Sequence, residues 1–191
     1  MLSELIKKKS LFSHLYKIDK ETAERYRKLP CPHCGGPLYF SNYMRKPRGE
    51  PDDVPDKYFI RFSLCCGTQG CRKRFIPPSC RFLGRKVYWF AVILCVLTDW
   101  QNSLKKITRF DWCIRTDISR NTIMRWLTFF SDRFPASRTW LEIRGQVSAC
   151  VSNNKLPSSL INYYQTFKST AEDALVASLI FLSGGVGIRA G

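Results

Sequence analysis

Two groups of closely spaced cysteines place the tightest constraint on how this chain can fold. Cys31 and Cys34 form a C-x2-C motif followed by a glycine, and a second group, Cys65-Cys66 and Cys71, follows later in the chain. Two such turns can place four thiolates tetrahedrally around a zinc ion, which supplies folding free energy that a small β module lacks. We therefore predict a structural zinc site, with one Zn²⁺ per chain. The predicted ligands are Cys31, Cys34, Cys66 and Cys71.

The choice between Cys65 and Cys66 rests on strand periodicity. Apolar side chains occupy every second position over residues 58–66, and Cys66 continues that row. Because side chains alternate between the two faces of a strand, Cys66 shares the face expected to be packed. We predict Cys66 as the ligand and keep Cys65 as the alternative. His33, between two predicted ligands, is expected to be an exposed loop residue.

Charge is the second constraint. The chain has 31 Lys and Arg against 15 Asp and Glu, a formal net charge of +16. This balance disfavours calcium chemistry and acidic substrates and favours a polyanionic partner, here double-stranded DNA. The segment Lys57–Phe90 contains eight basic residues and no acidic one. Such a segment can be merely a solvated surface, but its overlap with a metal site favours nucleic acid. The residues expected to contact phosphates are Arg45, Lys46, Arg48, Arg72, Lys73, Arg74, Arg85 and Lys86, with Arg81 extending the same stripe.

Helical periodicity begins after Pro77-Pro78. It predicts helices over Val87–Asp99, Ser103–Ile114 and Arg120–Arg133, the last capped by Ser119. The last two helices and the polar turn between them have the order of a helix-turn-helix, whose second helix reads the major groove. The residues of that helix expected to contact DNA are Arg120, Asn121 and Arg125. The alternative interpretation is an ordinary pair of helices in a bundle.

These patterns predict an α+β fold: a small zinc-ribbon β module followed by an all-α helix-turn-helix bundle and C-terminal helices. We expect an N-terminal helical segment (1–30), a zinc ribbon (31–86), a helix-turn-helix (87–140) and C-terminal helices (141–191). Within the first segment, Asp19 is expected to cap a short helix over Lys20–Lys28. Strands are expected over 37–44, 57–66 and 72–76, and the last helices over Ser158–Phe167 and Ala171–Ser183.

The sequence also predicts where the protein works. The two longest apolar stretches, Val87–Thr98 and Ala174–Ile188, are shorter than the ~20 residues that span a bilayer, so no membrane partner is expected. The odd number of cysteines and the lack of a secretory signal favour a reducing compartment, and we expect a cytoplasmic protein.

Four strings of the sequence together resemble a known group of proteins. CPHCGG, CCGTQGCRKRF, PPSCRFLGRKVY and TIMRW are similar to the zinc-ribbon and helix-turn-helix front end of bacterial insertion-sequence transposases. They look closer still to small zinc-ribbon proteins of transposons, and the resemblance extends from about Asp19 to Arg138. It implies zinc bound at the four predicted cysteines and a role in DNA recombination.

The resemblance does not extend to catalysis. A ribonuclease-H-like transposase domain needs three acidic residues on a sheet to hold two metal ions. After Arg138 the chain offers only Glu142, Glu172 and Asp173, on expected helices. We therefore expect a non-enzyme: a zinc-dependent, sequence-specific DNA-binding protein of a mobile element, assisting a separate transposase or recombinase. The alternatives are a transcriptional regulator, or a zinc-stabilised scaffold that binds RNA or another protein. The C-terminal helices are expected to support a homodimer.

Overall fold

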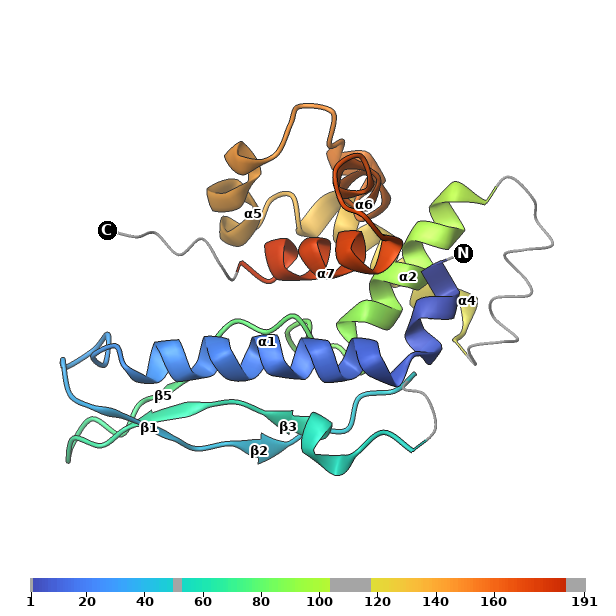
Figure 1. The fold of residues 1–191 in the computed structure, drawn as a ribbon. Helices are drawn as coiled ribbons and strands as arrows, with labels where there is room; N and C mark the ends of the chain where they lie inside the picture. Colours follow the sequence, from blue (N-terminus) through green and yellow to red (C-terminus); the bar gives the residue numbers. More distant parts are fainter. Residues whose placement is uncertain (1, 50–52, 104–117, 185–191) are drawn as a thin grey trace.

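A long helix, α1 (Lys9–Arg27), separates a layer of short strands from the other helices (Figure 1). Figure 1 shows a computed structural model that describes residues 2–49, 53–103 and 118–184. Helices and strands both contribute, so the predicted α+β class is confirmed. A 3₁₀ helix, Leu2–Lys7, precedes α1 and packs against α2 (Phe90–Asn102).

The prediction for the N-terminal helix was wrong in its start and in the role of Asp19. The helix begins eleven residues earlier and runs through Asp19 without interruption. Its buried face consists of Leu11, Phe12, Leu15, Asp19, Thr22 and Ala23, at the i, i+3, i+4 spacing of an amphipathic helix. Asp19 is not a cap because its carboxylate is bonded to residues 79–81, far away in the sequence.

The strand layer contains two small antiparallel sheets. One has the order β1-β4-β5, formed by Leu38–Phe40, Leu64–Cys66 and Arg74–Phe75. The other pairs β2 (Tyr43–Met44) with β3 (Ile60–Arg61).

The two long predicted strands are each interrupted. Residues 37–44 form β1 and β2, and residues 57–66 form the end of a 3₁₀ helix (Asp56–Phe59), β3 and β4. The interruptions lie side by side, where the Ser41 N–H donates to the Ser63 carbonyl and the Ser63 N–H donates to the Asn42 side chain. The pairings on either side of this point, Phe40 with Leu64 and Tyr43 with Arg61, keep the same register, so the two segments form one antiparallel hairpin that is interrupted at Ser41-Asn42.

The helical part confirms most of the expected helices. They are α2, α4 (Arg120–Thr128), α6 (Ser158–Gln165) and α7 (Ala171–Leu182). A further helix, α5 (Arg138–Ile143), was not predicted. A π-helical turn, Phe129–Arg133, continues α4, and 3₁₀ turns occur at Arg144–Gln146 and Asn153–Lys155. The expected helix over Ser103–Ile114 and the turn after it lie outside the described residues.

Two apolar clusters hold the fold together. The larger joins α1 to the helical part, with α2 buried on almost every side. The smaller consists of Cys31, Leu38, Leu64 and Cys66, with Tyr26, Cys71 and Phe75 packed against it. No helix in the described part of the chain is both long and apolar enough to cross a membrane.

The cap of α4 gives a first prediction. The Ser119 hydroxyl accepts a hydrogen bond from the Thr122 N–H at 3.3 Å, as the sequence indicated. Ser119→Ala should lower the free energy of unfolding by about 1 kcal/mol, because one N–H of the first turn loses its partner. Urea unfolding measures the change. Ser119→Asp retains a capping oxygen and should remain within a few tenths of a kcal/mol of the wild type; equal losses in both variants would contradict the capping role.

Candidate metal centre

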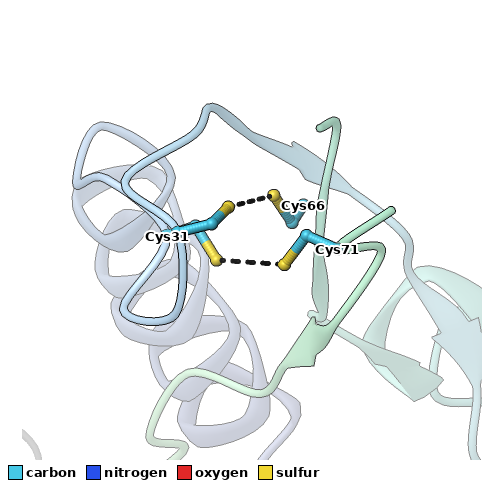
Figure 2. Close-up of side chains that lie close together, drawn as sticks. Cys31, Cys66 and Cys71 are labelled. Carbon is cyan, nitrogen blue, oxygen red and sulfur yellow. Dashed lines mark hydrogen bonds between the residues drawn. The ribbon is translucent and has the colours of Figure 1, made fainter. Parts of the chain in front are cut away.

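The structure brings the four predicted cysteines together at one end of the strand layer (Figure 2). The Sγ atoms of Cys31, Cys34, Cys66 and Cys71 all lie within 4.8 Å of one another. The Cys31 and Cys71 sulfurs are 3.9 Å apart, and those of Cys34 and Cys66 are 3.4 Å apart. Among the residues that the structure describes, this is the group of side chains that could hold a metal ion.

The sulfur spacing suits a tetrahedral ion. A metal–sulfur bond of about 2.3 Å in tetrahedral geometry places neighbouring sulfurs about 3.8 Å apart. The two measured pairs, at 3.4 and 3.9 Å, lie on either side of that value. Small side-chain rotations would therefore fit four thiolates around one ion, a donor set that favours soft metals over magnesium or calcium.

The first pair of thiols is positioned by a tight turn after α1. The Cys31 N–H donates to the Gly36 carbonyl and the Gly35 N–H donates to the Cys31 carbonyl, both at 2.8 Å. Gly35 has a φ of +73°, which glycine adopts without strain. A Cβ at Gly36 would overlap the side chain of Thr68 from the second cysteine group. The bare Gly36 backbone thus lets the two turns approach closely enough to share one ion.

The second pair is held at the end of β4. The Cys66 N–H donates to the Lys73 carbonyl at 3.0 Å, and the Cys71 N–H donates to the Thr68 carbonyl at 3.1 Å. The Thr68 N–H points at the Cys66 sulfur, 3.4 Å away. An N–H donated to sulfur stabilises the thiolate, the form that binds metal.

The surroundings shift the pKa values of Cys34 and Cys71 in opposite directions. The pKa of Cys34 is lowered to about 6, chiefly by the backbone N–H of Gly36 and then by the Cys66 thiol. The pKa of Cys71 is raised to about 11: the Lys73 N–H lowers it, but desolvation and the neighbouring sulfurs outweigh that bond. In the absence of a metal, Cys34 therefore ionises at a lower pH than Cys71.

Two neighbouring residues lie outside the group. Cys65 points to the opposite side of β4, with its sulfur 3.4 Å from the Arg72 carbonyl. Strand alternation thus identified Cys66 correctly, since Cys66 is buried inside the group. His33 is exposed and is not part of it, as expected.

One predicted surface residue is buried. Arg81 was expected to extend the basic stripe, and this was wrong: its side chain is 0% exposed. Its guanidinium donates to Asp19 at 2.7 Å and to the carbonyls of Tyr58 and Ile60. A carboxylate buried on α1 pairs with this arginine, so the charge is neutralised in the core and does not reach the surface.

The remaining basic residues occupy two places. Arg72, Lys73 and Arg74 are exposed and follow Cys71 directly in the sequence. The others lie on two loops that hydrogen bonds hold together. The Arg45 guanidinium donates to the carbonyls of Gly84 and Lys86 at 2.6 Å, and Lys46, Arg48 and Arg85 are exposed on the same loops.

The second of these loops also contacts α4 and the π-helical turn that continues it. The Lys86 ammonium lies 4.7 Å from the centre of the Phe129 ring, and the Tyr88 ring meets Trp126 edge to face at 5.1 Å. On α4, Ile123 and Trp126 are buried, whereas Arg120, Asn121 and Arg125 are exposed. Predicted DNA-contacting residues from distant parts of the sequence are thus neighbours in space.

Sequence reasoning missed two features of this region. One is the buried pair of Asp19 and Arg81, which no local pattern indicates. The other is the pair of exposed tyrosines, Tyr39 and Tyr43, on the strand layer. The sequence analysis used both tyrosines only as evidence for strands. Strand alternation could have indicated that Tyr39, which follows the buried Leu38, faces solvent.

No protein-family model, curated protein or solved structure matches this chain.

Proposed function

We propose that the four clustered thiolates bind one Zn²⁺ and that the surrounding turns and sheets form a zinc ribbon. Two observations support this: the donor set consists of sulfur alone, and the sulfur spacing suits tetrahedral coordination. The ion would tie the turn after α1 to the end of β4. Its role would be structural, since four protein ligands leave no position for a substrate.

We further propose that this zinc-stabilised fold binds double-stranded DNA in a sequence-specific way. The supporting observation concerns α4: Arg120, Asn121 and Arg125 face solvent, and the loop that carries Lys86 contacts Trp126 and Phe129. The Arg48 backbone is hydrogen-bonded to that same loop. Arg and Asn pair with the edges of guanine and adenine, whereas loop cations beside a recognition helix suit phosphates.

The wider role proposed is that of a non-catalytic protein of a mobile element, which recognises DNA for a separate transposase or recombinase. This part of the proposal rests on the sequence resemblance. A helix-turn-helix would place α4 in the major groove, with self-association through the C-terminal helices suited to paired half-sites.

Substitution of Arg120 tests the recognition helix. Duplexes would first be selected from a random-sequence pool with the zinc-loaded protein. Arg120→Ala should then weaken binding to the selected duplex by about 1–3 kcal/mol and flatten the base preference at one position, because a bidentate contact is lost. Asn121→Ala should flatten a different position. Fluorescence anisotropy against selected and scrambled duplexes measures both effects.

Two further variants separate recognition from charge. Arg48→Ala should weaken every duplex about equally and reduce the salt slope by about 1, as expected for a phosphate contact. Lys20→Ala removes an exposed charge on α1 and should change neither preference nor slope. If the protein binds no duplex at all, the proposed function is wrong and the scaffold alternative is favoured.

A further inference from the structure

The outer face of the three-stranded sheet carries aromatic and basic side chains together. The register pairs Tyr39 with Cys65 and Cys65 with Arg74, so these residues form one row across β1, β4 and β5. Leu64 and Cys66 are buried on the opposite face, toward the metal site and α1. Figure 1 shows α1 along only one side of the strand layer. The row that contains Tyr39 therefore faces solvent.

The Tyr39 ring is both exposed and held in place. It is 58% exposed, although its edge lies against Gly67, where a Cβ would overlap the ring. The missing side chain at Gly67 thus lets one edge of the ring lie close to the backbone. The rest of the ring remains available to a partner.

A second aromatic ring is fixed nearby. The Arg74 guanidinium lies 5.7 Å from the centre of the Tyr43 ring and donates to the Ser41 hydroxyl at 3.2 Å. Tyr43 is 36% exposed. These two contacts hold the Arg74 guanidinium against the Tyr43 ring, next to the row that contains Tyr39.

The charge of this region has one sign. Residues 28–49 contain no acidic side chain, and neither does Lys57–Phe90. Arg72 and Lys73, which adjoin Arg74, are exposed. We define the tyrosine face as Tyr39, Tyr43, Arg72, Lys73 and Arg74. It lacks the acidic residues that would pair with basic groups of a protein partner, and it suits a polyanion that also offers flat apolar rings.

We propose that the tyrosine face binds single-stranded DNA, with unpaired bases stacked on the two tyrosine rings and phosphates near the three cations. Aromatic platforms combined with cationic side chains are the usual way in which proteins hold unpaired strands. The interior bases of a duplex are covered by their neighbours and cannot stack on a protein ring. This inference rests on the proposed DNA-binding function: α4 would bind the duplex, and the tyrosine face an adjoining unpaired strand.

The experiment measures binding of the zinc-loaded full chain to fluorescein-labelled oligo(dT) of 15 nucleotides, at several salt concentrations. Tyr39→Ala and Tyr43→Ala should each weaken this binding about 5- to 150-fold, the range found for loss of one base-stacking ring. Tyr39→Phe retains the ring and should bind within about twofold of the wild type. Phe167→Ala is the matched control, since Phe167 is 55% exposed on the far helical part and should not matter. Zinc content is checked for every variant.

The same variants are titrated with a blunt duplex in parallel. Unchanged duplex binding by Tyr39→Ala, with weakened oligo(dT) binding, supports the inference. A wild-type protein that binds the duplex but not oligo(dT) overturns the inference and leaves the proposed function standing. Equal losses from Phe167→Ala and Tyr39→Ala also overturn it, as does tighter binding to oligo(U), which would assign the face to RNA. Photo-crosslinking with 5-iododeoxyuridine should label the peptide that contains Tyr39, and a crosslink confined to other peptides would contradict the assignment.

Discussion

Cys66→Ser is expected to abolish stoichiometric zinc binding and to unfold the strand layer. Cys66 is fully buried, and its sulfur faces that of Cys34 at 3.4 Å, so serine removes a ligand from the centre of the group. In a structural zinc module the free energy of metal binding is folding free energy, on the order of 10 kcal/mol for the whole site. The loss of one of four ligands should therefore cost several kcal/mol, comparable to the stability of a small domain.

The neighbouring thiol provides a matched control. Cys65→Ser changes the same atom one residue away, on the face of β4 that points away from the group. Inductively coupled plasma mass spectrometry should find one zinc per chain in the wild type and in Cys65→Ser, and much less than one in Cys66→Ser. If Cys65→Ser loses zinc and Cys66→Ser retains it, the ligand assignment is wrong.

Chelation of the metal tests the same site without mutation. The smaller apolar cluster surrounds the cysteines, whereas α2 and α6 belong to the larger one. Removal of zinc should therefore increase hydrogen exchange in β1 and β4 far more than in α2 or α6. Similar exchange in the metal-free and metal-loaded strand layers would show that the ion does not stabilise it.

The sequence predicted the group of four cysteines because the placement of each pair is local. Each pair of thiols is placed by a turn of a few residues, and the choice of Cys66 over Cys65 follows from the period of a single strand. Ser119 and the apolar spacing after it likewise predicted α4 within its own segment. In each case the residues that decide the structure are neighbours in the sequence.

The wrong role predicted for Asp19 arises because its hydrogen-bond partners lie far away in the sequence. Asp19 has the chemistry of a helix cap, and a Ser/Thr/Asp/Asn residue before a helical pattern is a standard start signal. Its carboxylate instead accepts hydrogen bonds from the Cys80 N–H at 2.8 Å and from the hydroxyl of Ser79. Nothing in residues 9–28 indicates those partners, so the burial of Arg81 could not be predicted from local sequence. The earlier start of α1 did have a local signal, the helical spacing of Leu11, Phe12 and Leu15.

The interrupted strands have a similar cause. Strand composition over 57–66 is continuous, but the backbone around Ser63 bonds to Ser41 and Asn42 of the other segment. The position of the exposed Tyr39 ring depends on the missing side chain at Gly67, which directly follows the partner strand β4. Sequence periodicity thus identified the strands, while their breaks and the tyrosine face depend on pairing between segments.

Asp19→Ala is expected to lower the free energy of unfolding by about 3–5 kcal/mol, because it leaves the Arg81 guanidinium buried and uncompensated. The two side chains are 2% and 0% exposed and their charged atoms are 2.7 Å apart. The Arg81 guanidinium also lies 5.0 Å from the centres of the Tyr16 and Phe82 rings.

Glu142→Ala is the control, because it breaks an ion pair of the same length on the surface. Arg138 and Glu142 also lie 2.7 Å apart, but their side chains are 92% and 56% exposed. An exposed pair of this kind contributes less than about 1 kcal/mol. Urea unfolding measures the loss in free energy of unfolding for each variant, so it compares a buried and an exposed ion pair of equal length. Similar losses in both variants would contradict the larger cost expected for the buried pair.

The zinc content of Asp19→Ala separates this pair from the metal site. Asp19 and Arg81 connect α1 to residues 58–60 and 79–81, while none of the four sulfurs bonds to either side chain in the described structure. Asp19→Ala should therefore retain one zinc per chain at temperatures where it remains folded, despite its lower stability. Stoichiometric zinc in a destabilised Asp19→Ala and lost zinc in Cys66→Ser would assign the two sites separate roles: the ion would organise the strand layer, and the buried pair would attach that layer to α1. A deficit of zinc in folded Asp19→Ala would instead show that the two sites form one cooperative unit.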